Sequence, residues 1–241
     1  MKRYVLLSAA LLSTLVLNVA ASAQTDARAR AAAEIESLRE QIKAKEAVLL
    51  SVPGEDRERY AEFLARPRTG LVRLLPREKW DGKLSTRGGG AYFSFTRLTH
   101  EYGYGSDIEL QQGQFSVGFA GADFGFLSNL GDVPLENVSL DTEALKPLVE
   151  FRTPAPEKGA REQQRRASEG FKEGERTYTD RLAAVAGNTY ALRSVNYDNS
   201  DVLVAFRVLH RDEDGSVILL WKMLKKFPKP TLERGVASAE H

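Results

Sequence analysis

The sequence predicts a mainly β (α+β) fold, an antiparallel β sandwich or open barrel preceded by an N-terminal helical hairpin. Two zones of alternating residues, 88–131 and 188–227, predict the strands. A segment rich in Ala, Glu, Arg and Lys near the N-terminus predicts the helix. The chain has 241 residues, of which 42% are hydrophobic, enough for one medium-sized core or two small ones. From the two strand zones we expect one β-rich domain at residues 70–227.

The first 23 residues have the pattern of a secretory signal peptide. Lys2 and Arg3 precede an apolar stretch at 5–19, and Ala-Ser-Ala follows at 21–23. A membrane-spanning helix is the rival interpretation, but it needs about 20 apolar residues. We therefore expect cleavage after residue 23, a periplasmic or secreted protein, and no stable membrane insertion after cleavage.

Residues 25–50 are expected to form a helix with an apolar stripe. The stripe consists of Ile35, Leu38, Ile42 and Leu49, at spacings of three, four and seven. Lys45 interrupts it, so any coiled-coil seam is short. The helix is either an arm that contacts a partner or a second copy, giving a possible homo-oligomer through residues 25–50, or a solvated helix packed loosely on its own domain.

A second, shorter helix is predicted at 55–65. Pro53 and Gly54 end the first helix, and Tyr60, Phe63 and Leu64 then share one helical face. The two helices would make a helical arm over residues 24–66.

The zone at 88–131 predicts antiparallel strands. It contains 10 of the 19 glycines and 9 of the 21 aromatic residues of the chain, with only five charged residues. Phe93 and Phe95, then Phe115 and Val117, alternate with small or polar residues, as in half-buried strands. Glycines between these segments supply turns or bulges.

Residues 152–181 are expected to form a solvent-exposed, charged excursion between the two strand-forming halves. The segment has 14 charged residues in 30, eight positive and six negative. So few apolar side chains predict almost no burial.

The C-terminal zone predicts a three-stranded meander, with strands at 190–196, 202–210 and 217–225. Turn residues at 198–201 and 212–215 connect them. The last two strands are largely apolar on both faces, so the sheet should be covered on both sides. The tail at 228–241 is expected to be disordered.

Composition excludes several classes of protein. The formal net charge of +1 makes a nucleic-acid partner unexpected, and a chain without cysteine has no thiolate nucleophile or Cys-ligated metal. The acidic turn at 212–215 resembles a calcium loop, but Met223 stands where such a loop needs its distal Glu, so we interpret it as a hairpin turn. We expect neither a cofactor nor a metal.

The segment at 100–107 has the composition of a ligand-binding surface. Five residues in it could stack on a ring or bond to its edge: His100, Glu101, Tyr102, Tyr104 and Asp107. Glu101 and Asp107 could also form an acid–base pair for glycoside cleavage. The structural interpretation is a turn whose tyrosines cover a sheet edge.

The leading functional hypothesis is an exported, non-enzymatic binding or interaction module with an unknown protein or glycan partner. The alternatives are a carbohydrate-active or other hydrolase that uses Glu101 and Asp107, and a structural protein of the cell envelope.

Overall fold

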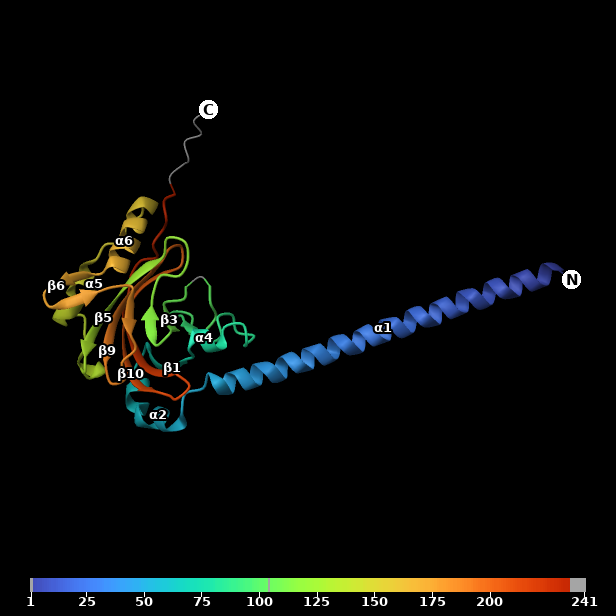
Figure 1. Cartoon of the computed structure of the whole chain (residues 1–241), viewed down its shortest axis with the longest axis horizontal. Coiled ribbons are helices and arrows are strands. Elements are labelled where there is room, and N and C mark those ends of the chain that lie inside the picture. Colours follow the sequence, from blue (N-terminus) through green and yellow to red (C-terminus); the bar gives the residue numbers. More distant parts are fainter. Residues whose placement is uncertain (1, 104, 235–241) are drawn as a thin grey trace, which may run out of the picture. The chain divides into compact units, whose positions relative to one another are not determined.

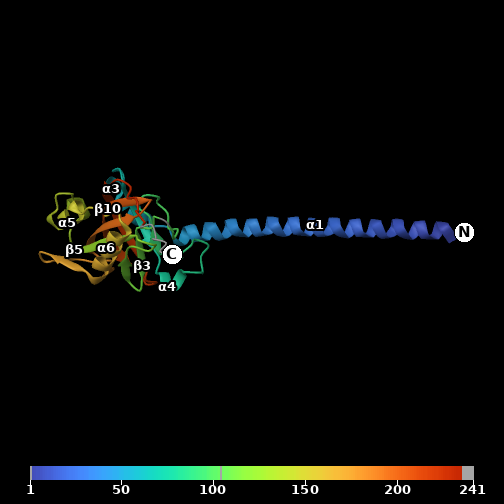
Figure 2. The same ribbon diagram turned by 90° about the horizontal axis from the view of Figure 1, so that it is seen from above.

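The chain forms two compact units, residues 1–48 and 49–241. The computed structural model describes residues 2–103 and 105–234, and side chains from residue 26 onward. The first unit is made by α1 (Lys2–Leu49), which is one uninterrupted helix in both views (Figures 1 and 2). Among the residues whose side chains are described, no helix is both long and apolar enough to span a bilayer.

The second unit consists mostly of antiparallel β sheet, as the sequence predicts. In the described part of the chain there are three sheets, and none of them closes into a barrel. The five-stranded sheet has the order β1 (Thr69–Leu74), β11 (Val217–Lys226), β10 (Ser200–Arg211), β9 (Thr189–Asn196) and β5 (Phe124–Gly131). The four-stranded sheet has the order β2 (Tyr92–Phe93), β3 (Ile108–Gln111), β4 (Gln114–Ser116) and β8 (Arg181–Ala183), and β6 (Phe171–Glu173) pairs with β7 (Arg176–Tyr178).

The predicted C-terminal meander is present. Val204 of β10 pairs with Leu192 of β9 on one side and with Met223 of β11 on the other. β5 adds to the free edge of β9, with Phe124 opposite Val195. One strand of the glycine- and aromatic-rich zone, β5, therefore joins the C-terminal meander in one sheet, whereas β2, β3 and β4 of that zone belong to the four-stranded sheet.

The five-stranded sheet is covered on both faces, because its strands alternate between two apolar clusters. On one face, Val204 and Phe206 pack with side chains of the four-stranded sheet. Phe115 of β4 lies edge-on to Phe206, with ring centroids 5.1 Å apart. The two sheets are therefore joined by a shared apolar core.

Helices and loops cover the other face, where Leu203 and Ala205 point. The covering elements are α3 (Ala61–Leu64), η1 (Leu135–Asn137), η2 (Glu143–Leu145), α5 (Lys146–Glu150) and α6 (Glu157–Glu169). The predicted helix at 55–65 is divided at Tyr60 into α2 (Gly54–Arg59) and α3, and Phe63 of α3 lies in this core. A further short helix, α4 (Arg77–Trp80), follows β1.

The segment at 152–181 is exposed over much of its length, but it is not a free excursion, because part of it packs against the core. α6 packs along β5, as Figure 1 shows, and Ala160, Ala167 and Tyr178 are completely or almost completely buried. The apolar residues are few, but Ala160 and Ala167 are seven positions apart and so lie on one helical face. The placement of these residues, and not their number, determines burial here.

The expected disordered tail is wrong for residues 228–234. Pro230 accepts a hydrogen bond from the Asp198 amide, and Glu233 forms a parallel bridge with Pro156. Residues 235–241 lie outside the described part of the chain.

A polar network attaches α2 to the β10–β11 turn. The two ring nitrogens of His210 lie 2.9 Å from Asp56 and 3.0 Å from Asp212, and Asp212 also pairs with Arg73. Burial alone would lower the pKa of His210, but its hydrogen bonds to the two carboxylates and their charges outweigh burial and raise it. The acidic turn at 212–215 is thus engaged in structural contacts, with Gly215 donating to the Asp212 carbonyl.

Candidate functional site

His100, the first residue of the predicted ligand surface, is engaged in contacts within the fold. Its Nε2 lies 2.7 Å from the carbonyl oxygen of Arg73, and its ring packs edge-on against Phe93 at 5.3 Å. Burial lowers the pKa of His100, and the backbone hydrogen bond opposes that shift without cancelling it. The imidazole therefore connects the loop to β1.

Asp107 is completely buried and so is not accessible to a ligand. Its carboxylate accepts hydrogen bonds from the amide of Phe95 at 2.8 Å and from the side chain of Asn196 at 3.0 Å. Burial raises its pKa to about 7, although these hydrogen bonds act in the opposite direction. Asp107 thus joins the 94–107 loop to β9 within the core.

The buried carboxyl predicts a pH-dependent stability. Between about pH 4 and 7 the native state holds a proton on Asp107 that the unfolded state lacks, so the free energy of unfolding falls as pH rises. The fall should reach a few kcal/mol, because each unit of pKa shift corresponds to about 1.4 kcal/mol. Urea denaturation across this range should show a shallower fall in Asp107→Asn than in the native protein. The exposed substitution Asp141→Asn is the matched control, and identical slopes in all three proteins would contradict the assignment.

The aromatic part of the predicted surface forms a cluster that the sequence did not suggest. Tyr102 packs on Tyr92 with ring centroids 4.7 Å apart, and Phe119 lies edge-on to Tyr92 at 5.2 Å. The guanidinium of Arg87 lies over the Tyr102 ring at 5.1 Å. Tyr104 lies outside the described residues. The ring of Tyr102 therefore packs against another aromatic ring and an arginine.

Glu101 and Asp107 lack the geometry of an acid–base pair. Glu101 is exposed, whereas Asp107 has no exposed surface. A substrate cannot reach both carboxyls without unfolding of the loop.

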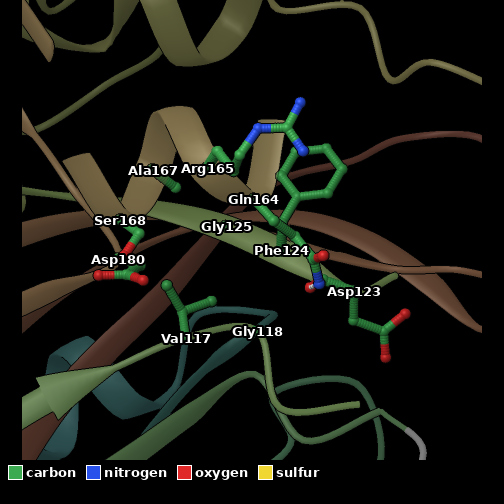
Figure 3. Close-up of a pocket in the computed structure, with 10 residues that line it drawn as sticks. All are labelled: Val117, Gly118, Asp123, Phe124, Gly125, Gln164, Arg165, Ala167, Ser168 and Asp180. Carbon is green, nitrogen blue, oxygen red and sulfur yellow. Dashed lines mark hydrogen bonds between the residues drawn. The ribbon is translucent and has the colours of Figure 1, made fainter. Parts of the chain in front are cut away.

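A hollow of about 280 Å³ lies between α6 and β5 (Figure 3). Gln164 spans it, donating hydrogen bonds to the carbonyl oxygens of Gly121 and Asp123 at 3.0 and 2.8 Å. The other lining residues mix small, apolar and charged side chains: Val117, Gly118, Phe124, Gly125, Arg165, Ala167, Ser168 and Asp180.

Two carboxyls of this hollow have raised pKa values. Burial raises the pKa of Asp123 to about 6, against the hydrogen bond that it accepts from the Tyr197 amide, and burial also raises the pKa of Asp180. Figure 3 shows Asp180 beside Ser168 at one end and the Asp123 carboxyl directed away at the other. The two acids therefore do not face a common point. No histidine lies among the lining residues to activate the Ser168 hydroxyl.

A cavity of about 620 Å³ lies between η2 and the β6–β7 hairpin. Its charged residues are of both signs, namely Glu143, Lys146, Glu173, Glu175 and Arg176. Its lining residues include no histidine, and they do not carry charges of a single sign. The lining therefore does not indicate which class of ligand the cavity would bind.

Among the ion pairs of the described residues, that of Arg193 and Asp201 is the most buried. Nε of Arg193 is 2.5 Å from one carboxylate oxygen of Asp201, and its Nη2 is 2.8 Å from the other. Nη1 donates to the Leu148 carbonyl oxygen at 2.6 Å, and the guanidinium lies 3.2 Å from the ring centroid of Phe227. Sequence analysis missed this pair, although an arginine in the centre of an otherwise uncharged strand signals a buried partner.

The α1 stripe, defined as Ile35, Leu38, Ile42 and Leu49, remains exposed. Between 39% and 50% of the surface of each of these side chains is accessible. Large apolar side chains exposed at a regular helical spacing are typical of an interaction surface. Of the features described, the α1 stripe comes closest to a known mode of recognition, the packing of the apolar face of an amphipathic helix against a partner.

No protein-family model, curated protein or solved structure matches this chain.

Proposed function

We propose that the protein is an exported, non-enzymatic interaction module of the bacterial periplasm or cell exterior, in which helix α1 contacts a partner protein or a second copy of the chain. We also propose that its two main sheets form an open β sandwich, which serves as a rigid body attached to this helix. The exposed α1 stripe is the observation that carries the proposal.

Energetics support an interface on α1. In proteins, most of the stability of a helix comes from packing of its apolar face and not from intrinsic helix propensity. Residues 26–45 of α1 are exposed throughout. Association that buries the α1 stripe would supply the missing stabilisation.

Export is supported by the charged, apolar and small-residue segments within residues 1–23. The hydrolase alternative lacks geometric support, because Glu101 and Asp107 do not share an accessible surface. A glycan partner is the second kind of ligand, and the half-buried ring of Tyr102 beside Arg87 favours it as a stacking position. A structural role in the cell envelope would use α1 as a spacer of about 39 Å after residue 23.

Truncation of the helix tests the proposal. Protein exported to the periplasm is expected to begin at Gln24, and light scattering should give a mass above that of one chain at micromolar concentration. Deletion of residues 24–48 should leave a monomer with an unchanged unfolding transition, because these residues belong to a separate compact unit. A monomer both before and after deletion would remove self-association from the proposal.

A further inference from the structure

The residues around the α1 stripe define a specific partner. A heptad frame that places Ile35 and Ile42 at position a places Leu38 at position d. Ala31 and Lys45 are then the flanking d residues. β-branched residues at a with leucine at d favour parallel, two-stranded coiled coils. We propose that α1 pairs with the α1 of a second copy as a short, parallel, in-register coiled coil, which deepens the proposed function and rests on it.

Charge complementarity selects a second copy and fixes the orientation. Glu34 occupies position g and Arg39 the following position e of this frame. In a parallel dimer, position g of one helix faces position e of the next heptad in the other helix. Glu34 therefore faces Arg39 of the second copy, and the two-fold axis produces this pair twice. An antiparallel arrangement brings g against g and e against e, and so does not join these residues.

Arg39 is available for such a pair. Its contact with Glu36 in the same helix is 3.4 Å long, and both side chains are about two-thirds exposed. An exposed pair of this kind contributes little to stability. Reorientation of the guanidinium towards Glu34 of a second copy therefore costs little.

Lys45 limits the strength of the association. Two lysines face each other at this d layer in a parallel dimer, and such a polar residue reduces stability while it restricts register and oligomeric state. The seam from Ala31 to Lys45 spans about 21 Å at a rise of 1.5 Å per residue. We expect a dissociation constant on the order of micromolar.

Single cysteines test the orientation, because the chain contains no native cysteine. In a parallel, in-register dimer, each d residue faces its own copy, so Ala31→Cys and Lys45→Cys should both form disulfide dimers with oxidised glutathione as the electron acceptor. The matched control is Ala33→Cys, which places the same substitution on the outer face. We expect Ala31→Cys to cross-link at least tenfold faster than Ala33→Cys.

The alternatives give different results. In an antiparallel dimer, identical residues at the ends of the seam are separated by roughly 15 Å or more, too far for a disulfide. A dimeric mass without cross-linking at residues 31 and 45 would overturn the parallel pairing and leave the proposed function intact. A monomeric mass at all concentrations would overturn the pairing, and a different protein would then be the expected partner of α1.

Discussion

Replacement of Arg193 by methionine is expected to lower the free energy of unfolding by about 3–5 kcal/mol, the usual cost of removing one partner from a buried ion pair. Arg193 is only 1% exposed. The substitution leaves the buried carboxylate of Asp201 with the hydroxyl of Thr153 as its remaining side-chain partner. It also leaves the Leu148 carbonyl oxygen without its donor. Urea denaturation followed by tryptophan fluorescence measures the loss.

The matched control is Arg161→Met. Arg161 also forms an ion pair, with Glu157 at 3.1 Å, but 45% of its side chain is exposed. We expect a loss of less than about 1 kcal/mol there. The double variant Arg193→Met, Asp201→Asn should be more stable than Arg193→Met alone, because no uncompensated charge remains buried. Equal losses in Arg193→Met and Arg161→Met would contradict the structural role of the buried pair.

The C-terminal strands were predictable because their sequence pattern is local. The alternation of Val204 and Phe206 with Leu203 and Ala205 indicates a strand that is apolar on both faces, and turn residues mark its ends. β1 was not predicted as a partner of this sheet. Its residues at 69–74 pair with β11 about 150 positions later, and no short pattern contains that information.

Long-range contacts explain the burial within 152–181 and the ordered residues of the tail, neither of which the sequence predicts. Net composition describes how much apolar surface a segment has, but not whether a neighbour covers it. Ala160 and Ala167 are small, yet α6 places both against the core. Glu233 is ordered because its backbone pairs with residues 155–157, a contact with no signal in the sequence.

The predicted ligand residues show the same limit. Spacing placed five chemically suitable side chains in one segment, but the direction in which each one points depends on the fold. Asp107 points inward to Asn196, and His100 points to the backbone of β1. The α1 stripe was easier to predict, since helical periodicity is local and sets which side chains share a face.

Substitution of Leu38 by glutamate is expected to raise the dissociation constant of the dimer at least 100-fold. The change removes an apolar side chain from the central d layer and places two carboxylates there. Loss of a buried leucine costs roughly 2 kcal/mol or more in each chain. The matched control is Ala33→Glu, which introduces the same residue on the exposed outer face and should change the dissociation constant less than threefold.

Sedimentation equilibrium of the native protein, Leu38→Glu and Ala33→Glu over a range of concentrations tests most directly whether the α1 stripe is the interface. At micromolar concentrations we expect a monomer–dimer equilibrium for the native protein and Ala33→Glu, and a monomer for Leu38→Glu. A single dissociation constant shared by all three proteins would contradict the account.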